Sequence, residues 1–263
     1  MDRYKLKVIP KWTKTKDEIW KESFESLTDD DMCHSRNVVF LKRWLRYASI
    51  AAAVFLVFFS SLAFFYTQEI VVGRGEKMAL VLPDGSDVLL NAESVLRFKP
   101  YWWYVNRGVE LVGEGFFEVA KGKKFRVNSE NGVVSVLGTS FNVFSRKSDY
   151  RVACVTGKVG VETAKYKTVL LPNQECVMES DALLVKENKN VVRNISWVDG
   201  MFYFENASFT QVIAEIERQY DVSIKVPAHA DYFYTGNFSK SLSVEEVLEI
   251  VGTPFAIVLE IAK

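Results

Sequence analysis

The sequence predicts a membrane-anchored, mainly β protein with a short helical tail, one transmembrane helix, an all-β domain and a small α+β domain. Three observations predict it: an uncharged apolar run at residues 48–66, short β patterns over 67–190, and alternating strand and helix patterns over 195–263. The 33 basic and 33 acidic residues give a formal charge of zero. A nucleic-acid-binding chain usually has a basic excess, so we expect no direct nucleic-acid partner.

Residues 1–47 form a polar tail with one helical pattern. Thr15 and Glu18 have the spacing of a capping box, and apolar residues then recur at helical spacing: Ile19, Trp20, Phe24 and Leu27. A helix this short is marginal alone in water, so the apolar stripe predicts a partner. We expect these four residues to dock a cytoplasmic protein. The alternatives are a helix lying on the membrane surface and a hairpin with residues 38–45.

The apolar run at residues 48–66 is long enough to cross a bilayer as a helix, which takes about 20 residues. The apolar part of a cleaved signal peptide is shorter and lies close to the N-terminus. Lys42, Arg43 and Arg46 precede the run, and a basic flank stays in the cytoplasm. The sequence therefore predicts an uncleaved inner-membrane anchor, with the N-terminal tail in the cytoplasm and residues 67–263 in the periplasm.

Short strand patterns separated by turn residues fill residues 67–190. Turn signals include Pro83-Asp84-Gly85-Ser86 and Thr156-Gly157. A sandwich, a barrel and a β-solenoid all fit this spacing. Two strands are expected at residues 109–112 and 115–119, and the polar segment 179–194 is expected to be a domain boundary.

The last part of the chain alternates strands and helices. Strands are expected at residues 202–204, 222–226, 232–238 and 256–261, and two helices begin at Ser208-x-x-Gln211 and Ser243-x-x-Glu246, which resemble capping boxes. The order β-α-β-β-α-β predicts a small α+β domain.

Nothing in the sequence predicts an enzyme, a metal site or a cofactor. The two histidines, His34 and His229, lie on opposite sides of the predicted membrane helix, so they cannot share a site. Cys33, Cys154 and Cys176 are far apart and form no Cys-x-x-Cys motif. Cys154 and Cys176 are expected either to form a disulfide in an oxidising compartment or to be two small buried residues.

An aromatic cluster at residues 101–104 (YWWY) allows a second reading. Such rings pack in a core or an interface, or they stack on a sugar. The alternative function is therefore a membrane-anchored periplasmic glycan-binding protein. An inward docking helix distinguishes the two readings, because a lectin does not need one.

Several motifs in the β region are longer than strand-and-turn patterns require. They are residues 72–78 (VGRGEKM), 82–86 (LPDGS) with 90–92 (LNA), 112–119 (VGEGFFEV), 136–143 (VLGTSFNV), 156–159 (TGKV) and 171–174 (LPNQ). In sequence and order they resemble FecR-type anti-sigma factors, with Asn173 in place of the usual glycine. Residues 197–261 resemble the secretin/TonB short N-terminal-type domain that ends many Bacteroidetes members.

The resemblance implies a regulator that spans the inner membrane. Such proteins receive a signal from a TonB-dependent outer-membrane transducer and control an extracytoplasmic-function sigma factor that directs nutrient-uptake genes. Many members have a longer inward domain than these 47 residues, so inhibition and activation of the sigma factor both stay open. The predicted sigma-binding residues are those of the tail helix, and the predicted transducer-binding residues are Phe202, Phe204, Val222 and Ile224.

The resemblance also suggests one cleavage site, the Gly138-Thr139 peptide bond, because some members are processed in this region. A threonine hydroxyl can attack the preceding carbonyl carbon to give an ester that water opens. The alternative is that Gly-Thr simply turns the chain, with the hydroxyl bonded locally.

Overall fold

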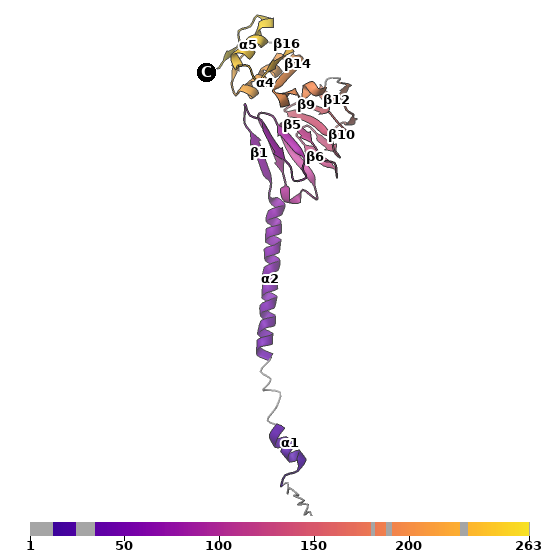
Figure 1. The fold of residues 1–263 in the computed structure, drawn as a ribbon, viewed down its shortest axis with the longest axis vertical. Helices are drawn as coiled ribbons and strands as arrows, with labels where there is room; N and C mark the ends of the chain where they lie inside the picture. Colours follow the sequence, from indigo (N-terminus) through magenta and orange to yellow (C-terminus); the bar gives the residue numbers. More distant parts are fainter. Residues whose placement is uncertain (1–12, 25–34, 180–181, 188–190, 227–230, 263) are drawn as a thin grey trace, which may run out of the picture. The chain divides into compact units, whose positions relative to one another are not determined.

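A computed structural model describes residues 13–24, 35–179, 182–187, 191–226 and 231–262. The chain forms two compact units, Met1–Ser61 and Leu62–Lys263. The first contains helix α1 (Lys16–Phe24) and most of helix α2 (Ser35–Phe65). The second contains the last turn of α2 and all the strands (Figure 1). Leu27, Cys33, His34 and His229 lie outside the described residues.

Helix α1 begins with the predicted capping box. The Thr15 amide donates to Glu18 Oε2 (2.8 Å), and the Glu18 amide donates to Thr15 Oγ1 (3.3 Å). These bonds satisfy two amides that a helix start leaves without partners. Hydrogen bonds from the Thr15 backbone and side chain to the Glu18 carboxyl hold its pKa below its ordinary value. Trp20 is 63% exposed on this helix.

Helix α2 contains the apolar segment Phe40–Phe65, which is long and apolar enough to cross a membrane, with a mean hydropathy of 2.3. The helix begins at Ser35, well before the predicted start of the span. Its 31 residues extend about 46 Å, more than the roughly 30 Å of bilayer hydrocarbon. Residues 35–47 contain no Gly or Pro, so nothing interrupts the helix before the apolar run.

The β domain, strands β1 to β13, consists of two sheets that share the long strand β5 (Arg107–Glu118). With the first half of β5, the first sheet contains β1 (Gln68–Val72), β4 (Ser94–Phe98), β6 (Phe125–Asn128), β7 (Val133–Val136), β10 (Val159–Glu162) and β11 (Lys167–Leu170). With its second half, the other sheet contains β2 (Met78–Val81), β3 (Asp87–Leu90), β8 (Ser140–Arg146), β9 (Asp149–Cys154), β12 (Gln174–Glu179) and β13 (Ala182–Glu187).

Both sheets contribute side chains to one apolar core, so the fold is a sandwich, one of the three predicted options. Phe117 stacks on Phe141 of the paired strand β8, with ring centroids 5.2 Å apart, and packs against Phe125 of the other sheet at 6.2 Å. Trp103 is 1% exposed and packs edge-on against Phe98 and Phe125. The aromatic cluster is therefore divided, because Trp103 belongs to the core whereas Tyr101 and Tyr104 are exposed.

The two strands predicted around Gly113 form a single strand. Gly113 has φ +102°, and a Cβ atom there would lie 2.8 Å from the Ser94 Cα. Only glycine accommodates this close approach, and it lets β5 pass from one sheet to the other. Arg107 and Glu118 consequently lie at one end of the sandwich, and Gly113 lies at the opposite end.

We call these the helix-proximal and the distal end. The chain enters the sandwich from α2 at Gln68, which pairs with Phe98 at the helix-proximal end. Strand β1 then runs to the distal end, where the C-terminal domain lies (Figure 1).

The predicted boundary segment 179–194 is wrong in part, because it contains strand β13 and the short helix α3 (Val191–Asn194). β13 pairs only with β12 among the described strands, and it is mostly exposed although its sequence, ALLVKE, begins with four apolar residues. Cys154 and Cys176 lie on the adjacent strands β9 and β12 as buried free thiols. Burial raises the pKa of Cys154 to about 11 and that of Cys176 to about 12.

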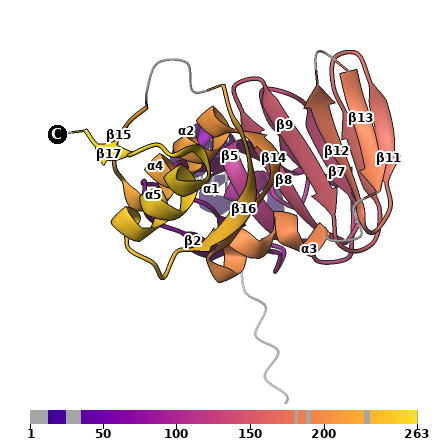
Figure 2. The same cartoon turned by 90° about the horizontal axis from the view of Figure 1, so that it is seen from above.

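The C-terminal domain follows a short 3-10 helix, η3 (Ser196–Asp199), and has the predicted β-α-β-β-α-β order (Figure 2). Its elements are β14 (Met201–Ser208), α4 (Phe209–Tyr220), β15 (Ile224–Lys225), β16 (Phe233–Ser239), α5 (Val244–Gly252) and β17 (Glu260–Ile261). β14 pairs with β16 and β15 with β17, giving two small antiparallel sheets. Both predicted capping boxes are present at the starts of α4 and α5.

Candidate functional site at the interdomain contact

Three buried polar residues of the β domain meet at its distal end. Glu114 lies in β5, Asn142 in β8, and Asn91 directly after β3. Glu114 Oε2 accepts a hydrogen bond from Asn91 Nδ2 (2.7 Å), and its Oε1 accepts one from Asn142 Nδ2 (2.8 Å). Each residue comes from a different sequence motif (LNA, VGEGFFEV and GTSFNV), so the fold brings three separate motifs into one cluster.

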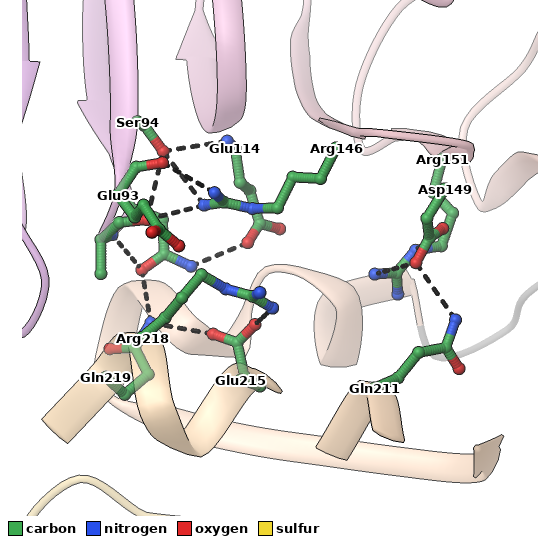
Figure 3. Close-up of polar contacts among 12 residues, drawn as sticks. Glu93, Ser94, Glu114, Arg146, Asp149, Arg151, Gln211, Glu215, Arg218 and Gln219 are labelled. Carbon is green, nitrogen blue, oxygen red and sulfur yellow. Dashed lines mark hydrogen bonds and ion pairs between the residues drawn. The ribbon is translucent and has the colours of Figure 1, made fainter. Parts of the chain in front are cut away.

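Helix α4 supplies the other side of the contact (Figure 3). Glu215 Oε2 accepts a hydrogen bond from Arg218 Nη2 (2.6 Å), and its Oε1 accepts one from Gln219 Nε2 (2.9 Å). The side chains of Glu215 and Arg218 are only 11% and 13% exposed. In a buried setting a carboxylate requires such partners, because an uncompensated charge is costly.

The two asparagines connect the domains. Asn91 Oδ1 accepts from Gln219 Nε2 (2.8 Å), and Asn142 Oδ1 accepts from the indole Nε1 of Trp197 (3.3 Å). Each amide thus donates to Glu114 in its own domain and accepts from the C-terminal domain. An Asn side chain can do both at once, because its amide has a donor nitrogen and an acceptor oxygen. An apolar side chain can do neither.

Further bonds surround this cluster. The Gly75 amide donates to the Arg218 carbonyl (2.7 Å), Lys77 Nζ donates to the Trp197 carbonyl (3.0 Å), and Gln211 Nε2 donates to Asp149 Oδ2 (3.2 Å). Leu89 and Phe116 of the β domain pack against the core of the C-terminal domain. Apolar and polar contacts together make the two domains one folded unit.

Arg146 adds a second cation. Its guanidinium donates to the carbonyl oxygens of Ala92 (2.6 Å) and Glu93 (2.7 Å), which fixes it at the distal end (Figure 3). Its charge interacts favourably with both Glu114 and Glu215. The contact therefore encloses two carboxyl groups and two guanidinium groups.

The two carboxyl groups differ in their electrostatics. Burial, followed by the nearby charge of Glu215, raises the pKa of Glu114, whose direct partners are neutral amides. Burial also acts to raise the pKa of Glu215, but the charge and hydrogen bond of Arg218 outweigh it, so this pKa lies below its ordinary value. Glu215 is thus the carboxyl group of the pair that is held ionised.

A cavity of about 100 Å³ adjoins the cluster and is lined by both domains, including Glu114, Asn142, Arg151, Trp197 and Glu215. It has room for several water molecules. Among the described residues, no group of three or more His, Cys, Asp and Glu side chains is arranged to hold a metal ion. The hydrogen bonds of the cluster join the two domains.

The predicted transducer-binding residues pack inside the C-terminal domain. Phe202 and Ile224 are buried, and Phe204 and Val222 are partly buried against the same core. Phe202 and Phe204 both stack on Phe238, at 5.2 and 5.6 Å between ring centroids. Packing accounts for these side chains, and their contact with a transducer stays a prediction.

The predicted cleavage bond lies at the helix-proximal end. Gly138 has φ +151°, and Thr139 is buried, with an Oγ1 that has no hydrogen-bond partner among the described residues. The local bond expected for a plain turn is therefore not formed by this hydroxyl. Cleavage at this bond stays a prediction.

Sequence reasoning missed the residues of the interdomain cluster as a group. Glu215 and Gln219 are separated by one helical turn and lie beside the apolar positions Val212 and Ile216 of α4. A polar pair at i and i+4 beside an apolar stripe is the one local pattern that marks these residues. The pattern does not show that the β domain covers this face of α4.

Comparisons with known proteins agree with these motifs. A family model described as "FecR protein" matches residues 68–160, and one described as "FecR, C-terminal" matches residues 201–254. Two crystal structures of a candidate anti-sigma factor from Parabacteroides distasonis ATCC 8503 are similar, each with 31% sequence identity. Their TM-scores are 0.69 and 0.68, and the matches cover 73% and 72% of this chain and 93% and 92% of those chains.

No curated protein matches the sequence significantly. The two family models and the similar structures nevertheless cover both domains of the second unit, including the strands and the helix that build the interdomain cluster. The chain belongs to the FecR family of anti-sigma factors.

Proposed function

We propose that this anti-sigma factor relays a signal from a TonB-dependent outer-membrane transducer to an extracytoplasmic-function sigma factor, and so controls nutrient-uptake genes. Residues 1–47 would lie in the cytoplasm and residues 67–263 in the periplasm, with α2 in the inner membrane. The basic residues Lys42, Arg43 and Arg46 before the apolar run support this orientation.

The observation that carries the proposal is the separation of two different parts by one apolar helix. Before the span lies α1, a capped helix with the apolar residues Ile19 and Trp20, which suits binding to another protein. After the span lies a unit of two domains joined by buried polar bonds. A sensor that acts across a membrane needs such a division.

A continuous path of paired elements connects the C-terminal domain to the span. Gln219 of α4 bonds to Asn91, and Asn91 bonds to Glu114 in β5. β5 pairs with β4, β4 pairs with β1, and β1 begins three residues after α2 ends. We infer that docking on the C-terminal domain alters this contact and that the sandwich passes the change to α2.

The docking mode follows from burial. The side chains of Phe202 and Ile224 are committed to the core, so the transducer would bind through an exposed strand edge to which an extended segment can add. The predicted transducer-binding residues would then act indirectly, because their packing in the core holds the exposed strand edge in place.

The glycan-binding alternative has less support. Of the four clustered rings, Trp103 lies in the sandwich core with 1% exposure and is not available to a sugar, whereas Tyr101 and Tyr104 are exposed. The FecR family match favours a regulator over a sugar-binding protein.

The sigma-binding proposal is tested by replacing the apolar stripe of α1. Trp20→Ala with Phe24→Ala should lower the affinity for the sigma factor more than tenfold, because truncating interface anchors costs about 2 kcal/mol or more each. The measurement is co-purification of the full chain, in detergent, with its cognate extracytoplasmic-function sigma factor.

Lys21→Ala is the matched control, because Lys21 lies on the same helix but outside the apolar stripe. It should retain binding. Equal recovery of the sigma factor with the double variant and with Lys21→Ala would show that the stripe does not form the contact.

A further inference from the structure

The helix-proximal end of the sandwich carries an aromatic loop, residues 99–106, that the interdomain contact does not use. Tyr101, Tyr104 and Val105 are 67%, 79% and 76% exposed. Trp103 alone enters the core. Several large apolar side chains exposed on one short loop mark a surface that another apolar phase covers.

This loop contacts the last turn of the apolar helix. The Trp102 ring lies edge-on to the Phe64 ring at 5.0 Å between centroids, and Lys99 Nζ lies 5.2 Å from the centre of the same ring. Tyr101 lies 5.4 Å from Tyr66, centroid to centroid. Phe64 belongs to the segment Phe40–Phe65 that can cross a membrane. A side chain that touches Phe64 is therefore at the depth of the last turn of the span.

Basic residues gather at the same end. β6 pairs in parallel with β5, with Phe125 opposite Arg107, so the loop before β6 lies beside the aromatic loop. The Arg107 guanidinium, paired with Asp84, donates to the Ala120 carbonyl (3.0 Å) and to the Lys123 carbonyl, which holds this loop in place. The loop exposes three lysines: Lys121, Lys123 and Lys124.

Two further turns complete this surface. The Gly122 amide donates to the carbonyl of Leu137 (2.9 Å), and Leu137 is 65% exposed. Lys158 is exposed just before β10, which pairs with the neighbouring strand β7. Glu69 at this end is paired with Arg97 (2.7 Å). Two other carboxyl groups, Asp87 and Glu118, are exposed at this end. The exposed lysines outnumber them, so the surface has a basic excess.

We propose that this surface, residues 99–106 with Lys121, Lys123, Lys124 and Lys158, lies in the membrane interface and binds anionic lipid headgroups. Tyr and Trp rings prefer the headgroup level. Lysine stems lie along apolar material while their ammonium groups reach phosphate. The β domain then contacts the bilayer surface through this end. This inference depends on α2 spanning the membrane.

The test places a fluorophore on the loop of the full chain. The chain, carrying Cys33→Ser and Val105→Cys, is labelled with an environment-sensitive dye and reconstituted in nanodiscs of phosphatidylethanolamine and phosphatidylglycerol. Val105→Cys keeps both tyrosines, and the burial of Cys154 and Cys176, with their raised pKa values, keeps these thiols from reacting. Lipids with a spin label near the headgroup then quench the dye.

Two matched positions make the result decisive. Tyr166→Cys lies in the β10–β11 turn at the distal end of the first sheet, and Leu62→Cys lies in the last turns of α2. Quenching at position 105 should be several-fold stronger than at 166. If the dye at position 62 is quenched but the dye at position 105 is quenched no more than the dye at position 166, the loop does not lie in the interface, although α2 spans the membrane. If 62 is not quenched, the span itself is wrong, and the inference fails with it.

A second variant tests the lysines. Lys123→Glu with Lys124→Glu changes exposed side chains only, because Arg107 uses the backbone carbonyl of Lys123. Quenching at position 105 should fall and should no longer increase with the phosphatidylglycerol content. Unchanged quenching and unchanged dependence on anionic lipid would contradict the role of these lysines.

Discussion

Glu215→Ala should weaken the attachment of the C-terminal domain to the β domain by about 3 kcal/mol or more, the usual cost of removing one partner from a buried ion pair. The change removes the carboxylate that Arg218 bonds at 2.6 Å and that Gln219 bonds at 2.9 Å. Arg218 would then lose its carboxylate partner, and Arg146 would keep only Glu93 and Glu114, of which Glu114 has a raised pKa. Gln219 would also lose one of the two bonds that orient it toward Asn91.

Hydrogen exchange of the full chain, in detergent, measures this effect locally. Amides of α4 and of the paired strands β14 and β16 should exchange faster in Glu215→Ala, whereas the core strands β5 and β8 should keep most of their protection. Thr210→Ala is the control, because Thr210 is exposed on the same helix and its change should be within about 0.5 kcal/mol. Equal exchange in the two variants would show that the ion network does not hold the domains together.

Gly113→Ala should destabilise the β domain by about 3 kcal/mol, combining strain at a positive φ with a steric overlap. The added Cβ atom would lie 2.8 Å from the Ser94 Cα and 2.4 Å from its Oγ. Ser94 cannot move away easily, because it is buried in β4 and its Oγ accepts from the Glu114 amide (3.0 Å). The strand could no longer pass between the sheets as it does.

The midpoint of thermal unfolding of the full chain in detergent tests this expectation. Gly160→Ala is the matched control, because Gly160 lies in β10 without a positive φ, and a Cβ atom there would make ordinary contacts at 3.5 Å or more. The control should unfold near the wild-type temperature, and Gly113→Ala should unfold clearly below it. A Gly113→Ala midpoint equal to that of Gly160→Ala would mean that the strand does not need glycine at this bend.

Local signals predicted most of the elements. The capping boxes at Thr15, Ser208 and Ser243 marked three helix starts, because each depends on residues three positions apart. The β-α-β-β-α-β order of the C-terminal domain was also readable from local periodicity. The apolar run predicts the span but not the start of α2 at Ser35. Residues 35–47 include basic side chains, so the length of the apolar run does not show that the helix begins before it.

Other features depended on contacts between distant residues. The sequence pattern predicts two strands, 109–112 and 115–119, because it does not show that Ser94 approaches Gly113 closely. β13 was missed because an exposed edge strand lacks an alternating apolar pattern. The interdomain cluster was hidden for the same reason: Asn91 and Gln219 are 128 positions apart, so only the fold shows that they meet.

The resemblance of the motifs to one family was more informative than their individual chemistry. Glu114 and Asn142 belong to two of these motifs, and the structure shows that they are buried hydrogen-bonding partners. Asn142 bonds directly to the C-terminal part of the chain, and Glu114 orients both Asn142 and Asn91 for these interdomain bonds.

The most direct test of the account is sigma-dependent transcription in living cells. A strain lacking this chain would receive the wild-type protein or a variant in which α1 carries Trp20→Ala and Phe24→Ala, with equal amounts in the membrane verified by immunoblot. Expression of a reporter gene transcribed by the cognate sigma factor is then measured with and without the nutrient signal. The account predicts that the wild type restores signal-dependent transcription and that the variant does not. Full signal-dependent control by the variant would contradict it.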